Sequence, residues 1–369
     1  MRTRVCDLLG IEHPIFAFTR SPEVVAAVSR AGGMGVLGAV SFGPGELEAG
    51  LAWIDEHIDG KPYGVDVVMP VTYAGSEKIE LEKMIPEEHK QFVLDVLARF
   101  GVPALPEGEQ SPESLLSWTH DRARRQVQVA FEHGARLIAS ALGPPPPDVI
   151  EEAHRRGVQV AALVGNRKQA EDQVAAGVDI IVAQGTEAGG HTGDVATMVL
   201  VPEVVDAVHP APVLAAGGIG SGRQVAAALA LGAEGVWTGS IWLAVAEADT
   251  HSAVIEKLLA ASSRDTVRSR AMTGKPARQL RTSWTDAWDA ADSPGALPLP
   301  LQYMLTSEAQ HRLHRFADES PGARELVGTP VGQIVGAMKQ VRPVSAVMAD
   351  LISGFEEAAG RLASARSGA

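Results

Sequence analysis

Residues 179–193 read DIIVAQGTEAGGHTG, and the rest of the chain is interpreted from this stretch. Its first part, Asp179 to Ala183, is a short apolar run rich in β-branched side chains, which is typical of a strand buried on both faces. A polar loop with two adjacent glycines and a histidine follows directly. In an α/β barrel, the loops after the strands converge on one mouth, where active sites are built. We therefore expect the chemistry of this protein at residues 184–191.

The residue types of this loop suit a flat ligand and a proton transfer. Gly189 and Gly190 would let the backbone approach a ligand without an intervening Cβ atom. His191 can donate, accept or take a proton near neutral pH. The alternative is a structural histidine bonded to a backbone carbonyl. The position of His191 beside a glycine pair, just after a predicted barrel strand, favours the functional interpretation.

Short apolar runs alternate with amphipathic segments on both sides of the loop. The runs that predict strands are residues 15–18, 35–40, 63–69, 136–141, 158–164, 179–183, 212–216 and 235–238. Helical patterns lie between them, which implies parallel strands joined by right-handed crossovers. The sequence therefore predicts an α/β fold, a TIM (β/α)8 barrel over residues 1–245.

Two segments depart from this alternation. Residues 70–120 form an insertion after the third strand, with helical periodicity over residues 77–100 and prolines that predict a loop after it. It is either a lid that shapes substrate access, or a solvated excursion or subunit contact. Residues 246–369 are expected to form a helical extension, with helix-like segments at 307–316 and 331–338, which packs on the barrel or on a partner subunit.

Glycine-containing loops follow both of the last two predicted strands. Gly217 and Gly218 precede a predicted helix over residues 222–231, and the next strand continues into Gly239 and Ser240. Consecutive backbone N–H groups at the start of a helix suit an anion. Paired loops after strands 7 and 8 are the usual phosphate site of this barrel. Close packing between helix and strand is the alternative explanation of these glycines.

Composition restricts the partners. The chain has 369 residues, 46% of them hydrophobic, and a formal net charge of -13, which disfavours a nucleic-acid or anionic membrane surface. No apolar run approaches the roughly 20 residues of a membrane span. Cys6 is the only cysteine, so an intrachain disulfide is excluded. We expect a cytoplasmic globular protein without a metal site, because no set of His, Cys, Asp and Glu has ligand spacing.

The run Gln184-Gly185-Thr186-Glu187-Ala188-Gly189-Gly190-His191 resembles the signature of the nitronate monooxygenase family, formerly called 2-nitropropane dioxygenases, and of the related flavin-dependent enoyl-acyl-carrier-protein reductases. A weaker resemblance covers most of residues 1–285. The resemblance implies that FMN is the cofactor and that residues 1–245 bind it. Asp66 stands where the family often has an asparagine that contacts the flavin. The implied cofactor-binding residues are Asp66, Gln184, Gly189, Gly190, Gly217, Gly218, Trp237, Thr238, Gly239 and Ser240.

Three functions remain open at this point. The first is FMN-dependent oxidation of alkyl nitronates with O2, in which His191 is the donor to the nitro group or the base that takes the α-proton. The second is an FMN-dependent reductase or dehydrogenase on an enoyl thioester; Gln184, where those reductases more usually have Glu, favours the first. The third is a phosphate-binding barrel without activity. Glu187 would either orient His191 or pair with a nearby cation, and the protein could form a homodimer.

Overall fold

Eight parallel strands close into a barrel in the computed structural model, which describes residues 1–69, 78–109, 120–141 and 143–367. The order around the barrel is β1-β2-β3-β4-β5-β6-β8-β9, and β1 pairs with β9 to close it. The strands are β1 (Ile15–Thr19), β2 (Met34–Gly38), β3 (Gly64–Asp66), β4 (Leu137–Ser140), β5 (Gln159–Val164), β6 (Ile180–Gln184), β8 (Val213–Ala216) and β9 (Gly235–Thr238). The predicted TIM (β/α)8 barrel is confirmed.

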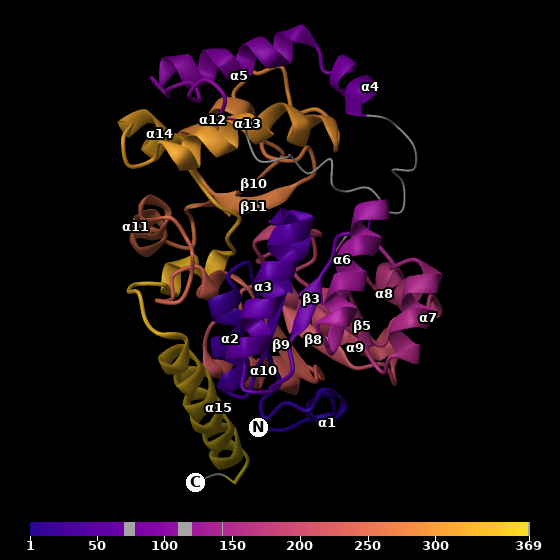
Figure 1. Ribbon diagram of the computed structural model, residues 1–369. Coiled ribbons are helices and arrows are strands. Elements are labelled where there is room, and N and C mark those ends of the chain that lie inside the picture. Colours follow the sequence, from indigo (N-terminus) through magenta and orange to yellow (C-terminus); the bar gives the residue numbers. More distant parts are fainter. Residues whose placement is uncertain (70–77, 110–119, 142, 368–369) are drawn as a thin grey trace.

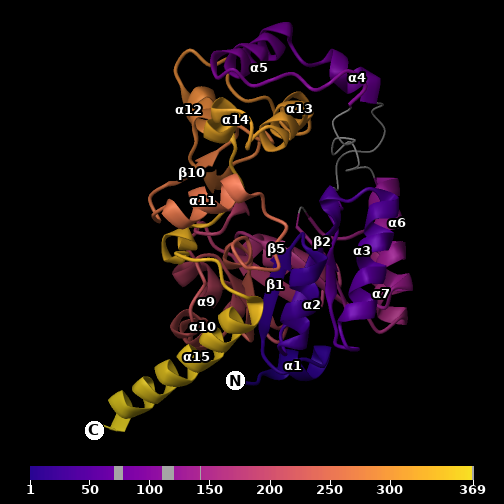
Figure 2. The ribbon, with the colours of Figure 1, turned by 60° about the vertical axis from the view of Figure 1, so that its left-hand side comes forward.

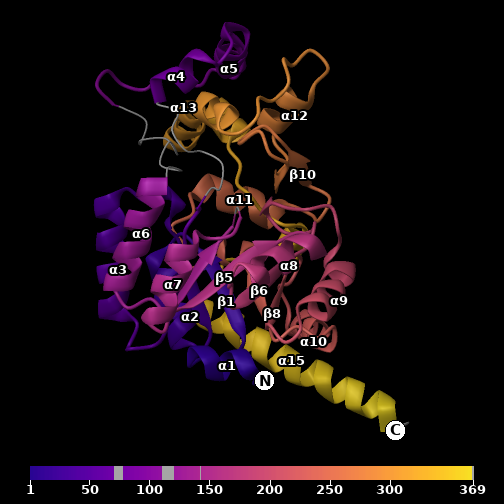
Figure 3. The same ribbon diagram turned by 90° about the vertical axis from the view of Figure 1, so that its right-hand side faces the viewer.

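Helices surround this barrel and cover its outer face (Figure 3). They are α2 (Pro22–Arg30), α3 (Pro44–His57), α6 (His120–Glu132), α7 (Pro147–Arg155), α8 (Arg167–Ala175), α9 (Thr197–Val208) and α10 (Gly222–Ala230). A short helix, α1 (Arg4–Leu9), lies at the amino-terminal end of the barrel. Its Val5, Cys6 and Leu9 belong to the same buried cluster as the barrel interior, so α1 plugs that end. The opposite end, where the strands finish, is left for the site.

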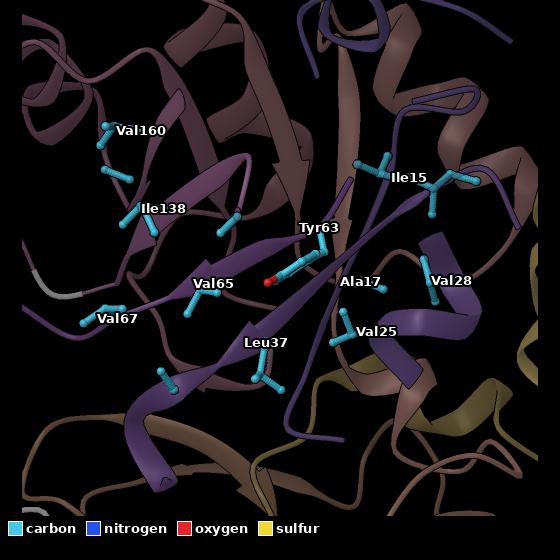
Figure 4. Packing of buried hydrophobic residues seen from close by; sticks show 14 of the residues in the cluster. Ile15, Ala17, Val25, Val28, Leu37, Tyr63, Val65, Val67, Ile138 and Val160 are labelled. Atoms are coloured by element: carbon cyan, nitrogen blue, oxygen red, sulfur yellow. The ribbon is translucent and has the colours of Figure 1, made fainter. Parts of the chain in front are cut away.

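Side chains alternate between two cores along each strand. Ile181 and Ala183 of β6 face the helices, whereas Ile180 and Val182 belong to the interior cluster. Figure 4 shows part of the outer core, where residues of β1 to β3 pack against α2. Each fully buried aliphatic side chain stabilises the fold by about 1.5–3 kcal/mol. The same alternation points Asp66 and Gln184, the last residues of β3 and β6, into the barrel.

A second layer, which we call the cap, lies above the end of the barrel where the strands finish (Figures 1 and 2). It combines helices of the insertion with helices of the extension: α4 (Lys78–Lys83), α5 (Glu87–Arg99), α12 (Ser283–Asp289), α13 (Leu301–Arg315) and α14 (Pro321–Leu326). Buried Arg312 of α13 donates to Val102 O and Pro103 O at 2.9 and 2.8 Å, which joins the two parts. The single helix expected over residues 77–100 is interrupted at Pro86, and residues 70–77 and 110–119 of the insertion lie outside the described residues.

A three-stranded sheet lies between barrel and cap (Figure 1). It consists of β7 (Gly190–His191), β10 (Thr266–Ser269) and β11 (Ala277–Leu280), in the order β10-β11-β7. Two of these strands, β10 and β11, lie within residues 246–369, which were expected to be helical, so the expectation was wrong for this part of the extension. β10 and β11 have only four residues each, the shortest length over which an alternation can be recognised, and β7 has two residues and pairs with a partner far away in sequence.

The rest of the extension packs against the side of the barrel. It contains α11 (Ser252–Ala260), the 3-10 helix η4 (Gln333–Ala337) and the long helix α15 (Val344–Ser367). In Figure 2, α15 runs past α10 towards the end of the barrel that carries the N-terminus. A Cβ atom on Gly222 of α10 would lie 2.2 Å from Phe355 N, so glycine permits this close crossing. Within the described ranges, no helix has the length and apolarity that crossing a membrane requires.

Candidate active site

The loop after β6 is fixed by backbone and arginine contacts on both sides. Gly185 N donates to Ala216 O at 2.9 Å, which joins the loop to the end of β8. Buried Arg278 of β11 donates from Nε to Thr186 O at 2.8 Å. Beyond these contacts the chain enters β7, where His191 pairs with Ala277 of β11. The backbone of His191 is therefore part of a sheet rather than of an unsupported loop.

The imidazole of His191 is held on one side only. Its Nε2 atom lies 2.8 Å from Thr273 Oγ1. Its Nδ1 atom has no hydrogen-bond partner in the described part of the chain, and it is not among the fully buried polar atoms that lack one. Burial, followed by the positive charge of Lys275, lowers the pKa of His191 to about 4. The ring is therefore neutral at pH 7 and offers Nδ1 as either acceptor or donor.

Glu187 does not orient His191. Its carboxylate accepts from Thr197 N and Thr197 Oγ1, each 2.9 Å from Oε2. Thr197 is the first residue of α9, so Glu187 satisfies an amide at the amino-terminal end of that helix. Of the two roles expected from the sequence, the hydrogen bonds do not include His191, and toward a cation Glu187 has a charge interaction with Arg278 without a hydrogen bond to it in the described part of the chain.

The glycine pair has a different explanation from the expected one. A Cβ atom on Gly189 would lie 2.8 Å from backbone atoms of Val331 and Gly332, so Gly189 is required by a neighbouring segment of the extension. Gly190 has a φ of +79°, which favours glycine, and the space around its Cβ position is open. The space that a flat ligand would need beside the backbone, which was expected at both glycines, is therefore open only at Gly190.

Two polar side chains end inside the barrel mouth. Asp66 is 4% exposed, and its Oδ2 atom is buried without a hydrogen-bond partner among the described residues. Desolvation raises the pKa of Asp66 to about 7. Gln184 is half-buried, and its side-chain amide likewise has no partner within the described ranges. Buried polar groups are normally hydrogen-bonded, so this pair requires a ligand or water.

The loop after β8 takes an unusual backbone path. Gly217 and Gly218 have φ values of +108° and +70°, and a Cβ atom on Gly217 would lie 2.6 Å from Thr197 Oγ1. Gln224 of α10 fixes the loop, because its Nε2 donates to Gly218 O at 2.5 Å and its Oε1 accepts from Gly220 N at 3.0 Å. The amide of Gly220 is therefore occupied, whereas that of Gly218 donates to no described residue.

In the loop after β9, some groups are used in contacts within the protein and others are free to bind a ligand. Trp237 points into the barrel and stacks on Phe16, with ring centroids 6.0 Å apart. Thr238 is occupied by a hydrogen bond to Phe16 O at 2.8 Å and by one from Trp242 Nε1 at 2.9 Å. Ser240 Oγ accepts from Gly332 N at 2.8 Å, which leaves its hydroxyl proton to donate. The amides of Gly239 and Ser240 have no acceptor among the described residues.

Sequence reasoning missed the residues that the extension brings to the site. Thr273 contacts His191 directly, and Gly332 lies between Gly189 and Ser240. Two arginines of the extension also reach the loop after β6: Arg278 donates to Thr186 O, and Arg268 donates to Thr192 O and pairs with Asp194. The glycine and proline in TPVGQ at residues 329–333 were the signal that could have indicated a close backbone approach.

The arrangement fits a flat, phosphate-bearing cofactor. The unpaired carboxyl of Asp66 and the amide of Gln184 end in the mouth, and free backbone amides follow the last two strands. A ring with both N–H and C=O groups would satisfy the former, and a phosphate would satisfy the latter. In the described part of the chain, no group of three or more His, Cys, Asp and Glu could hold a metal ion.

A barrel with unpartnered polar groups at its mouth and a neutral imidazole on the following loop is compatible with a flavin-dependent oxidoreductase. The family model described as nitronate monooxygenase matches residues 2–354, and the chain belongs to this family. The resemblance found in residues 184–191 is thereby confirmed. A "Probable nitronate monooxygenase" of Staphylococcus saprophyticus is 31% identical over 328 residues, covering 83% of this chain and 86% of the relative.

Other relatives cover nearly the whole chain. A Mycobacterium tuberculosis protein named "Putative monooxygenase" is 56% identical over 370 residues, or 98% of each chain. The solved structure of FabK from Thermotoga maritima has a TM-score of 0.74 and 31% identity, with 98% of each chain covered. Nitroalkane oxidase from Streptomyces ansochromogenes has a TM-score of 0.80 at 24% identity, covering 97% of this chain and 99% of its own, which shows the shared fold.

Proposed function

We propose that this enzyme binds FMN at the barrel mouth and oxidises alkyl nitronates with O2. Family membership supports the reaction class. The observation that carries the proposal is the unpartnered Nδ1 of a neutral His191, held beside a mouth whose polar groups lack protein partners. When bound, the flavin would take the electrons from the substrate and pass them to O2.

The protein groups divide between the two ends of the cofactor. Asp66 and Gln184 would bind the flavin ring, with the backbone of Gly189 and Gly190 beside it. The amides of Gly218, Gly239 and Ser240, with the hydroxyl of Ser240, would hold the phosphate. The left-handed turn at Gly217 shapes this loop, and Trp237 and Thr238 would contribute backbone only, because Trp237 packs in the interior and the hydroxyl of Thr238 is occupied.

His191 acts on the substrate in one of two ways. With a nitronate, an Nδ1–H group donates to a nitro oxygen. With a neutral nitroalkane, unprotonated Nδ1 takes the α-proton, and the electron pair of the broken C–H bond forms the C=N bond of the nitronate. Positioned proton transfer of this kind contributes about 10²–10⁴-fold in rate.

The second candidate is FMN-dependent reduction of an enoyl thioester, which the similarity to FabK favours. One experiment separates the candidates. Purified protein is first examined for flavin absorbance and for the flavin it releases on denaturation. Oxygen uptake with propyl nitronate is then compared with NAD(P)H oxidation with a crotonyl thioester. Oxygen uptake supports the first proposal, thioester-dependent NAD(P)H oxidation supports the second, and a colourless protein that binds no added FMN contradicts both.

A further inference from the structure

The hydroxyl group of Thr273 forms hydrogen bonds with the imidazole of His191 and with the backbone of Lys275. Thr273 is 9% exposed, in the turn between β10 and β11. Its Oγ1 atom lies 2.8 Å from His191 Nε2 and 3.3 Å from both the N and the O atoms of Lys275. The Lys275 amide is a fixed donor to this oxygen, so the one proton of the hydroxyl goes either to Lys275 O or to His191 Nε2.

The cap holds this turn in place. Gln302 and Thr306 of α13 are fully buried and donate to Ala271 O at 3.1 Å and Met272 O at 2.9 Å. Gly274 has a φ of +83°, and a Cβ atom there would lie 2.1 Å from Leu297 O. The backbone on both sides of Thr273 is therefore fixed, which leaves rotation of its hydroxyl proton as the available change.

We propose that Thr273 is a positioning residue, whose hydroxyl holds the imidazole of His191 and determines by its rotation which tautomer the substrate meets. The proposal rests on the function proposed above for His191. No functional role was expected for Thr273, which lies 82 residues from His191 in the sequence.

Each hydroxyl orientation corresponds to one role of His191. When Thr273 donates to Lys275 O, His191 donates from Nε2–H to Thr273, and Nδ1 is a lone pair. Nδ1 can then take the α-proton of a neutral nitroalkane, and the resulting imidazolium keeps its Nε2–H bond to Thr273. When Thr273 donates to Nε2, Nδ1 carries the proton and donates to the nitro oxygen of a nitronate. Both orientations have the same number of protons. They interconvert by exchange with solvent water, which takes the proton from one ring nitrogen and returns one to the other, and the hydroxyl of Thr273 stabilises whichever tautomer it is oriented for.

The test compares two substitutions of Thr273 with a matched control. Thr273→Val removes the hydroxyl at nearly constant volume, and Thr273→Ser restores it. Thr192→Val is the control, because Thr192 is adjacent to His191 and its hydroxyl has no partner among the described residues. All variants are compared with wild type at equal flavin content, with a neutral nitroalkane and with the pre-ionised nitronate as substrates.

We expect Thr273→Val to lower kcat/KM for the neutral nitroalkane by at least about tenfold, the low end of a lost proton-transfer arrangement. The pre-ionised nitronate needs no base. It uses the Nδ1–H tautomer, which valine disfavours less, because a buried Nε2–H group without an acceptor costs more than an unpaired nitrogen lone pair, so its loss should be less than about threefold. Thr273→Ser and Thr192→Val should stay within about twofold of wild type on both substrates. Equal losses on both substrates in Thr273→Val, or no rescue by serine, would overturn the proposal.

A spectroscopic measurement decides the same point without turnover. The ¹⁵N chemical shifts of the His191 ring, assigned by their loss in His191→Gln, report which nitrogen carries the proton. They should move in Thr273→Val, return in Thr273→Ser and remain unchanged in Thr192→Val. Identical ring shifts in wild type and Thr273→Val would refute the proposal. If the wild type oxidises neither substrate while these shifts move as expected, the proposed reaction fails and the Thr273 hydrogen bond stands.

Discussion

Glu187 Oε2 lies 2.9 Å from both the amide and the hydroxyl of Thr197. This carboxylate therefore connects the loop that carries His191 to the first turn of α9. A negative charge is favourable there, because the first amides of a helix lack internal acceptors. Thr197 Oγ1 also lies 3.1 Å from Gly217 O. The pair therefore connects the loop after β6 with the glycine loop after β8.

Replacement of Glu187 should weaken this connection. We expect Glu187→Ala to lower the free energy of unfolding by about 1–3 kcal/mol, because two hydrogen bonds to a half-buried carboxylate are lost. Urea denaturation of the purified protein measures the change. Glu203→Ala, on the exposed face of the same helix, is the control and should stay within about 0.5 kcal/mol of wild type. Equal effects of the two substitutions would contradict the anchoring role.

Removal of the His191 imidazole should separate binding from chemistry. We expect His191→Asn to keep its flavin, because no flavin contact is assigned to the ring, and to lose at least about tenfold in turnover. Flavin absorbance and oxygen uptake with a neutral nitroalkane, whose α-proton must be removed, measure the two properties on the same sample. Unchanged turnover in a flavin-replete variant would refute the role of His191.

On the acid side of the pH profile, kcat/KM should fall at a lower pH than an ordinary histidine would give. His191 has a pKa lowered to about 4, so the neutral ring that accepts a proton persists down to that pH. We expect kcat/KM for a neutral nitroalkane to fall below about pH 4, where the imidazolium forms, rather than near the ordinary histidine value of about 6.5. Initial rates from about pH 3 to about pH 8 test this. A limb near 6.5 that is absent from His191→Asn would contradict it.

Asp66 should make flavin-free protein less stable as the pH rises. Its pKa is raised to about 7 in the folded state, so the folded chain binds this proton more tightly than the unfolded chain does. Its contribution is complete below the unfolded pKa of about 4 and is lost as the pH rises through about 7. Relative to wild type, Asp66→Asn should therefore gain on the order of 1–4 kcal/mol at pH 8 compared with pH 4. Asp206→Asn, at an exposed site on α9, should show no such difference in urea denaturation.

The contribution of His133 to stability should also depend on pH, in the neutral range and more weakly than that of Asp66. Partial burial lowers the pKa of its ring, but hydrogen bonds and charges from Asp55 and Glu48 outweigh this and raise it. Its stabilising contribution is complete below about pH 6.5, the unfolded value, and is lost as the pH rises through the folded pKa. His133→Gln should therefore be less stable than wild type at pH 5.5, by no more than about 1 kcal/mol, and the difference should shrink by pH 8.5. Thermal denaturation at both values would contradict this if the gap were constant.

The sequence was sufficient for the barrel because strand burial there is a local property. Apolar runs such as Ile180 to Ala183 are buried on both faces, and this leaves a plain pattern in the residues themselves. The loops after the strands follow from the same alternation, which is why His191 and the glycines at 217–218 could be placed at one end. The inward direction of Asp66 and Gln184 is a consequence of the period of two along a strand.

Long-range contacts left no comparable pattern. Thr273 reaches His191 through the pairing of β11 with the two-residue strand β7, and no periodicity can be recognised over two residues. The start of α9 at Thr197 has no capping side chain to mark it, because Ala196 precedes it, and Pro202 lies inside the helix. The role of Glu187 depends on that start. The sequence therefore identified His191 and Glu187 as candidate residues, but it did not reveal their partners, Thr273 and Thr197.

Gly332 and Gln333 donate from their amides to Ser240 Oγ and Glu187 O, at 2.8 and 2.9 Å, and so tie together the rims of two barrel loops. Both residues emerge from the ribosome long after the eight strands have done so. A polypeptide released early, or one cut within the extension, would thus carry a complete barrel with an unfinished rim. The pocket can therefore attain its final shape only after Gly332 and Gln333 have been synthesised and have docked on these two loops.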